Sequence, residues 1–109
     1  MKRAYLTVQY AENKKRLNSA FKQFRKEGWK AEQDFWCCSS CGWSALEDEE
    51  AEKAIFYHRQ DTKTMQETGK LYLAWSGDGR RIVEILETFG LVVEWDGSEN
   101  KRILVNLIN

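Results

Sequence analysis

LYLAWSGDGRRIVEILETFGLVVEWDGSENKRILVNL, residues 71–107, is the stretch that decides the fold class. Its first five residues, 71–75, are apolar or aromatic, a composition typical of a buried strand. Between Gly79 and Gly90, apolar residues recur at helical spacing and a glycine stands at each end, which predicts an amphipathic helix. The stretch therefore opens with a strand that is followed by a helix.

The second half of this stretch predicts a hairpin. Apolar and β-branched runs at 91–95 and 102–107 flank Asp96-Gly97, which is a turn signal. A strand, a helix and a strand in succession over residues 71–95 predict a right-handed parallel crossover. The C-terminal part of the chain should thus contribute a crossover and a C-terminal hairpin to one sheet.

The N-terminal half carries one clear helix and one clear strand. Residues 11–27 have apolar side chains at helical spacing and are followed by Gly28, which predicts a helix that ends there. Residues 4–10 fit either a short strand or an extension of that helix. The apolar, aromatic run at 54–58 predicts a buried strand.

Two shorter helices are expected around this strand. A helical spacing that runs into four acidic residues predicts a solvated helix over about residues 43–53. Asp61 or Thr62 is expected to cap one or two helical turns that end before Gly69. The prediction is therefore an α+β (mixed) fold, with a small mixed sheet of about four strands and helices packed on it.

Length and composition point to one cytosolic domain. The chain of 109 residues has room for a single domain, residues 1–109, and its 42% of apolar residues can form a core despite 31% of charged ones. No apolar stretch reaches the roughly 18 residues of a membrane span, and the N-terminus lacks an apolar signal region. We therefore expect a cytosolic protein with reduced thiols, which agrees with an odd number of three cysteines.

All three cysteines lie within five residues, which marks this segment as a candidate metal site. Cys38 and Cys41 form a CxxC pair followed by Gly42, the form of a zinc knuckle in which glycine relieves the backbone. Structural zinc needs four ligands. The histidine of the chain, His58, is the third candidate ligand, and Cys37 or a carboxylate such as Asp61 is the fourth. Because adjacent cysteines in an extended segment point to opposite sides, using both Cys37 and Cys38 requires an unusual local backbone.

Two other interpretations of the cysteines stay open. In the first, they do thiol chemistry, either as a CxxC dithiol at a helix N-terminus or as a nucleophile activated by His58, with Asp61 or Gln60 orienting the imidazole. A thioredoxin fold is improbable because the chain has no proline for the loop that faces the dithiol. In the second, Cys37 and Cys38 are small buried hydrophobic residues at the edge of the core.

Charge is unevenly distributed although the formal net charge is zero. Residues 1–30 carry nine Lys or Arg and two Glu, whereas residues 31–56 carry one Lys and seven Asp or Glu. The plain interpretation is that the two segments are solvated faces or lie near each other in the fold. The alternative is a surface that uses Lys15, Lys22 and Lys26 to bind an acidic protein or nucleic acid.

A glycine-rich turn at residues 76–81 is a second candidate site. A turn of this kind that leads into a helix can hold a phosphate with backbone amides. Asp78 would repel an anion, however, and the turn lacks the endings of known phosphate loops. The favoured interpretation is a tight turn in which Ser76 or Asp78 caps the helix.

Four segments together resemble an uncharacterised bacterial family, a domain of unknown function with the pattern CCxxCG, FxHxQDT, LYLA and WDG. They are FWCCSSCG (35–42), IFYHRQDT (55–62), LYLA (71–74) and GLVVEWDG (90–97). The resemblance covers residues 35 to about 105, so the basic helix lies outside it. It brings no known activity, but it implies one constellation that consists of Cys37, Cys38, Cys41, His58, Gln60 and Asp61.

Three functions follow as hypotheses. The leading one is a small cytosolic binding or regulatory domain whose Cys38, Cys41 and His58, with Cys37 or Asp61, hold zinc or an equivalent polar cluster. The first alternative is a small thiol-dependent enzyme with a cysteine nucleophile and His58 as base. The second alternative is an interaction protein that uses its basic N-terminal helix.

Overall fold

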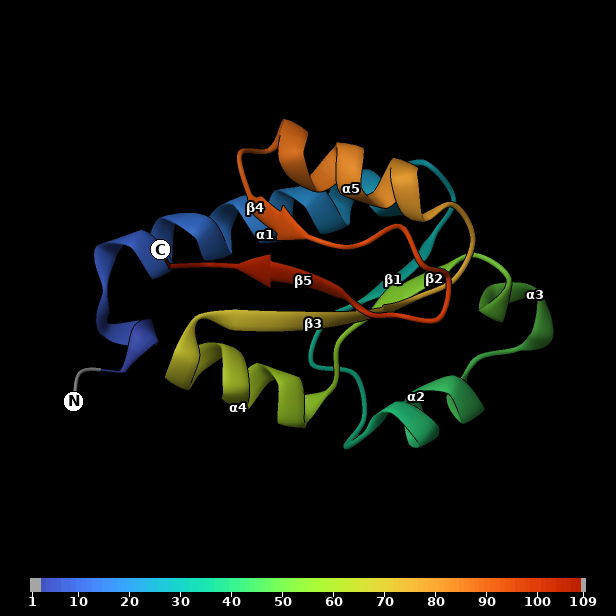
Figure 1. The fold of residues 1–109 in the computed structure, drawn as a ribbon. Coiled ribbons are helices and arrows are strands. Elements are labelled where there is room, and N and C mark those ends of the chain that lie inside the picture. The colour runs from blue at the N-terminus through green and yellow to red at the C-terminus, as the bar shows by residue number, and fades with distance from the viewer. Residues whose placement is uncertain (1–2, 109) are drawn as a thin grey trace.

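Five strands form one mixed sheet in the computed structural model, which describes residues 3–108 (Figure 1). The strands are β1 (Lys30–Glu32), β2 (Ala54–Phe56), β3 (Lys70–Trp75), β4 (Val92–Glu94) and β5 (Ile103–Asn106). Their order across the sheet is β1-β2-β3-β5-β4, and only the β1 and β2 pair is parallel. The predicted α+β class is therefore confirmed, with five strands instead of four.

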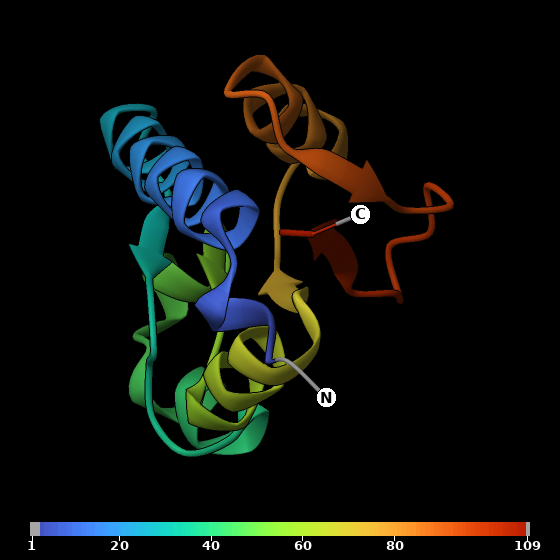
Figure 2. The same ribbon diagram turned by 90° about the vertical axis from the view of Figure 1, so that its left-hand side faces the viewer.

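Helices lie on both faces of this sheet, as the two ribbon views show (Figures 1 and 2). Helices α1 (Val8–Lys26) and α5 (Gly79–Thr88) cover one face, and α4 (Arg59–Thr68) and α2 (Ser39–Ala45) lie on the other. The remaining elements are the 3-10 helix η1 (Ala4–Leu6) and the short helix α3 (Asp48–Ala51). No helix within residues 3–108 is long and apolar enough to cross a membrane.

Helix α1 confirms the prediction for residues 11–27 and settles the ambiguous segment before it. The Thr7 hydroxyl accepts a hydrogen bond from the Tyr10 amide, so the helix begins three residues earlier than its apolar pattern. Residues 4–6 form a 3-10 turn, so the alternative of a strand over 4–10 is wrong. Gly28 ends the helix with a φ of +93°, a conformation that favours glycine.

Strand β2 separates two apolar clusters because its side chains alternate between the faces of the sheet. Ile55 belongs to the main core, which also contains the buried side of α1 and α5. Ala54 and Phe56 face the opposite way, into a second cluster that includes Leu46 and Ala74. The second cluster anchors the cysteine-containing segment, because Phe35 and Trp43 pack against it from either side of the cysteines.

The predicted parallel crossover over residues 71–95 is confirmed in strand direction, because β3 and β4 both run antiparallel to β5 and are therefore parallel to each other. Helix α5 does connect β3 to β4, but β5 lies between these two strands and pairs antiparallel with both. The reason is burial: Ile103 and Val105 of β5 are fully buried, whereas Val92 of β4 is 48% exposed, so β5 takes the inner position and β4 the edge. The predicted hairpin is confirmed by the pairing of β4 with β5.

The single helix predicted over 43–53 is two helices, α2 and α3. Leu46 adopts an extended conformation that places its side chain in the second cluster, and this ends α2. Glu47 and Glu50 then form a reciprocal capping box that starts α3. A capping signal in the acidic run therefore starts a new helix where the spacing predicted a continuation.

Helix α4 begins at Arg59, earlier than predicted. His58 is its N-cap, and Asp61 takes the third position of the helix in a reciprocal capping box with His58. The expectation that Asp61 or Thr62 is the cap is therefore wrong. The predicted end is confirmed, because Gly69 caps the helix with a φ of +79°.

The glycine-rich turn at 76–81 caps α5. The Asp78 carboxylate accepts hydrogen bonds from the amides of Arg80 and Arg81, as the favoured interpretation expects. Those two amides are the ones a phosphate would need. The phosphate interpretation of this turn is therefore not supported.

Gly42 is expected to be intolerant of a side chain. A Cβ at this position would lie 2.6 Å from Cε2 of Phe56, whose ring is 1% exposed and held in the second cluster. We expect Gly42→Ala to lower the free energy of unfolding by about 1 to 2 kcal/mol, because overpacking outweighs the better helix propensity of alanine. Urea denaturation measures this, with the exposed Ser44→Ala in the same helix as control. A Gly42→Ala protein as stable as the parent would contradict the close packing of α2 on β2.

Candidate functional site

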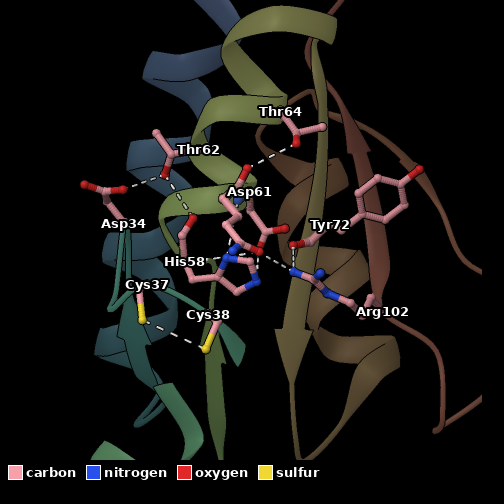
Figure 3. Close-up of polar contacts among 10 residues, drawn as sticks. Asp34, Cys37, Cys38, His58, Asp61, Thr62, Thr64, Tyr72 and Arg102 are labelled. Carbon is pink, nitrogen blue, oxygen red and sulfur yellow. Dashed lines mark hydrogen bonds and ion pairs between the residues drawn. The ribbon is translucent and has the colours of Figure 1, made fainter. Parts of the chain in front are cut away.

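The three cysteine thiols lie together at the start of α2. The Sγ atom of Cys37 lies 4.0 Å from Sγ of Cys38 (Figure 3) and 3.5 Å from Sγ of Cys41. The three sulfurs are all within 4.8 Å of one another. A disulfide would require about 2.05 Å, so all three are free thiols. Cys37 is exposed and the other two are half-buried, which does not fit the interpretation that they are core residues.

An unusual backbone immediately before the cysteines brings Cys37 and Cys38 to the same side. Asp34 has a φ of +53° and Trp36 a φ of +63°, values that residues other than glycine rarely adopt. The surrounding structure holds this conformation, because the Phe35 amide donates to the Tyr57 carbonyl at 2.8 Å and the Arg59 amide donates to the Trp36 carbonyl at 3.0 Å. The loop is therefore fixed to the end of β2 and the start of α4.

Cys38 and Cys41 stand at the N-cap and in the first turn of α2. Hydrogen bonds from the Cys41 amide and thiol lower the pKa of the Cys38 thiol. Hydrogen bonds with the thiols of Cys37 and Cys38, together with their charges, raise the pKa of Cys41 to about 11. Ionisation is thus favoured at Cys38 and disfavoured at Cys41, and a cation between the sulfurs would favour the thiolate form of both.

Gly42 has a role different from the predicted one. Its φ is not positive, so it does not relieve a strained knuckle. It lies inside α2 and allows the helix to approach the Phe56 ring closely.

His58 and Asp61 form a buried pair at the start of α4, and each residue is less than 8% exposed. The Asp61 amide donates to Nδ1 of His58 at 3.4 Å, and Nε2 of His58 lies 3.0 Å from Oδ2 of Asp61 (Figure 3). The same Oδ2 accepts a hydrogen bond from the His58 amide at 3.3 Å. Both nitrogens of the imidazole are therefore in contact with Asp61.

Arg102 completes this polar cluster, and the sequence offers no signal for it. Its Nη2 donates to Oδ2 of Asp61 at 2.5 Å and also to the Tyr72 carbonyl, and the guanidinium lies 5.9 Å from the centre of the Tyr72 ring. Asp61 and Arg102 are 41 residues apart in the chain, so only the tertiary structure pairs them. Gln60 lies outside the cluster, exposed on α4, where its carbonyl accepts a hydrogen bond from Thr64.

The donor atoms of the thiols suit a soft metal ion. Within residues 3–108, the three cysteines are the one set of three or more Cys, His, Asp or Glu side chains that could hold an ion. His58 and Asp61 are not part of this set. The structure thus brings Cys37, Cys38 and Cys41 together as one ligand set. It places His58 and Asp61 in a separate set of contacts with Arg102.

His58 is expected to make stability depend on pH. Burial lowers the pKa of His58, Arg102 adds to this effect and Asp61 opposes it. The unfolded chain, with an ordinary pKa near 6.5, then binds a proton before the folded chain does. Stability should fall as the pH drops below about 6.5, by at most about 1.4 kcal/mol per pH unit, and level off below the lowered native pKa.

Urea denaturation between about pH 5.5 and 7.5, around the ordinary pKa of histidine, measures this slope. His58→Asn is the control, because asparagine can also cap α4 but does not titrate. The same slope in both proteins would contradict the assignment to His58.

A mixed sheet with helices on both faces and a three-thiol cluster at the start of α2 defines a small α+β domain with a thiol site. The chain belongs to the family described as "Domain of unknown function (DUF6891)", whose sequence profile matches residues 8–109. The match includes α1, so the expectation that the basic helix lies outside the family is wrong. No curated protein and no solved structure matches the chain.

Proposed function

We propose that this chain is a small binding or regulatory domain that holds a thiophilic metal ion, zinc in the first place, with Cys37, Cys38 and Cys41. One observation carries the proposal, the closeness of the three sulfurs. Sγ of Cys37 lies 3.5 Å from Sγ of Cys41 and 4.0 Å from Sγ of Cys38, and all three sulfurs are within 4.8 Å of one another. Tetrahedral zinc with Zn–S bonds of about 2.3 Å separates its sulfur ligands by about 3.8 Å. The thiols thus already stand close to three corners of such a tetrahedron.

The chemistry of the donors supports the same assignment. Thiolates select soft or borderline ions such as zinc or Cu(I) over magnesium and calcium. A divalent cation would also stabilise all three thiolates together, whereas without it the neighbouring thiols raise the pKa of Cys41. Such a site needs reduced thiols, which a cytosolic location would supply.

A binding or regulatory role fits better than a purely structural one. The main core is formed by α1, α5 and the central strands, and it contains none of the three cysteines. The segment around the cysteines is held by the second cluster and by the backbone hydrogen bonds of Phe35 and Arg59. The fold therefore has its own source of stability, and the ion would be bound by a chain that is already folded.

Elemental analysis of the full chain, purified under reducing conditions without added metal, tests the proposal. We expect about one equivalent of zinc or Cu(I) per chain, and re-loading of the metal-free protein to the same ratio. Less than about a tenth of an equivalent, and no uptake on re-loading, would overturn it.

The lowered pKa of Cys38 favours a second candidate, a thiol-dependent enzyme. Cys38 would be the nucleophile, with His58 as base and Asp61, 3.0 Å from the imidazole, as the orienting group. Alkylation of each cysteine as a function of pH distinguishes the two functions in metal-free protein. A Cys38 thiol that reacts no faster than Cys37 below pH 8 would exclude this candidate.

The basic side of α1 supports a third proposal, binding to an acidic protein or nucleic acid. Lys15, Lys22 and Lys26 are all exposed along this helix. Binding to a nucleic acid should weaken steeply with salt and be lost when the three lysines are changed to glutamate. Absence of binding at low salt to nucleic acid, and equally to an acidic protein, would end this proposal.

A further inference from the structure

The strongest unexplained feature of the thiol cluster is its number of ligands. We infer that the chain leaves the fourth coordination position of this centre open, and that this position accepts a thiolate from another molecule. The inference rests on the proposed metal site. A centre with an open fourth position differs from a structural zinc site, in which the protein supplies all four ligands.

His58 is the obvious internal candidate for the fourth ligand, and its contacts oppose that role. Nδ1 accepts a hydrogen bond from the Asp61 amide, which uses its lone pair and places the ring proton on Nε2. Nε2 in turn lies 3.0 Å from the Asp61 carboxylate. Neither nitrogen has a free lone pair, and the ring also caps α4, so coordination would break the start of that helix.

Asp61 is the second internal candidate, and its Oδ2 atom is already held by hydrogen bonds. Its Oδ2 accepts hydrogen bonds from Nη2 of Arg102 at 2.5 Å and from the His58 amide at 3.3 Å. Asp61 is buried, and turning its side chain towards the thiols would leave the Arg102 guanidinium without its carboxylate. The ligand set found within residues 3–108 accordingly consists of thiols alone.

The open position can be reached from solvent. Cys37 is exposed, Cys38 and Cys41 are half-buried, and the neighbouring Trp36 is 53% exposed. The cluster therefore lies at the surface, where a ligand from another molecule can approach without a change in the fold.

A thiolate is the class of ligand that matches this centre best. Three sulfur donors favour a soft or borderline ion, and such an ion prefers a fourth sulfur over a carboxylate. In the binding step the incoming thiol forms a bond from its sulfur to the ion and releases its proton to solvent. No protein bond breaks, and no group is oxidised or reduced. A free low-molecular-weight thiol and a cysteine of a partner protein share this chemistry.

Cobalt(II) substitution of the full chain tests the inference, because the sulfur-to-cobalt charge-transfer absorption reports the number of bound thiolates. We expect absorption typical of three thiolates, which rises to that of four when 2-mercaptoethanol is added and not when acetate is added. The His58→Asn protein should match the parent protein in both spectra, the one recorded before the thiol is added and the one recorded after it. Saturable binding of reduced glutathione identifies a free thiol as one source, and binding of a cysteine-containing peptide tests the protein source.

The other possible outcomes overturn either the inference alone or the inference together with the proposed function. If the parent protein binds cobalt but does not respond to thiol, whereas His58→Asn does, His58 is the fourth ligand and the inference is overturned. If both proteins bind cobalt and neither responds, the position does not accept thiolates, and the inference fails while the metal site stands. If the parent protein binds no cobalt, zinc or Cu(I), the proposed function and the inference both fail.

Discussion

Replacing Cys41 with serine is expected to lower the zinc affinity of the full chain by at least about 100-fold, the upper end of the loss seen when only a supporting neighbour of a metal ligand is removed. Cys41 supplies one of three sulfurs, and its Sγ lies 3.5 Å from Sγ of Cys37. A serine hydroxyl cannot replace it, because it is a harder donor that does not ionise at neutral pH. Competition with a chromophoric chelator measures the affinity.

The matched control for this variant is Ser40→Ala, in the same turn. Ser40 is exposed and is not part of the ligand set. The zinc affinity of the Ser40→Ala protein should therefore stay within about threefold of the parent value, a change of less than about 1 kcal/mol in binding free energy. Cys37→Ser and Cys38→Ser should resemble Cys41→Ser. A Cys41→Ser protein with parental affinity would contradict the three-thiol site.

Removing the Asp61 carboxylate is expected to have the largest effect on stability among the polar residues. Oδ2 of Asp61 receives hydrogen bonds from Arg102 and from the His58 amide, and Nε2 of His58 lies 3.0 Å away. Asp61→Ala leaves a partly buried guanidinium without a counter-ion and an unsatisfied amide at the start of α4. We expect a loss of about 3 kcal/mol in the free energy of unfolding, measured by urea denaturation.

Two further variants in helix α4 serve as references for the stability of Asp61→Ala. Glu67 is exposed on α4, so Glu67→Ala should change the free energy of unfolding by less than about 0.5 kcal/mol. Asp61→Asn keeps an oxygen acceptor and should fall between the other two. If Asp61→Ala and Glu67→Ala are equally mild, the cluster around His58 contributes little to stability.

The parts of the fold that the sequence predicts well are those with a repeated local pattern. Helices α1 and α5 follow from apolar side chains at helical spacing, and the glycines that end them are visible in the sequence. Strand β1 has three residues, two of them charged, so no apolar run marks it. The insertion of β5 between β3 and β4 depends on which strand buries more apolar surface in the tertiary structure.

The candidate site divides in the same way. The spacing of Cys37, Cys38 and Cys41 predicts a thiol cluster, and the left-handed Trp36 supplies the unusual backbone that such a cluster requires. His58 can serve either as the cap of α4 or as a metal ligand. The sequence is compatible with both roles, and the structure shows the cap. Arg102 could not be predicted, because nothing local connects it to Asp61.

The position of β5 has a consequence for how the chain folds during synthesis. It is the last of the five strands in the chain and yet lies between β3 and β4. Until the ribosome has released residues 103–106, β3 lacks a neighbour on one edge and β4 has none. Strands β1, β2 and β3 can pair earlier, together with the segment that carries the cysteines. A partly folded state in which β5 has not yet paired therefore exposes an unpaired, apolar edge of β3, which favours aggregation.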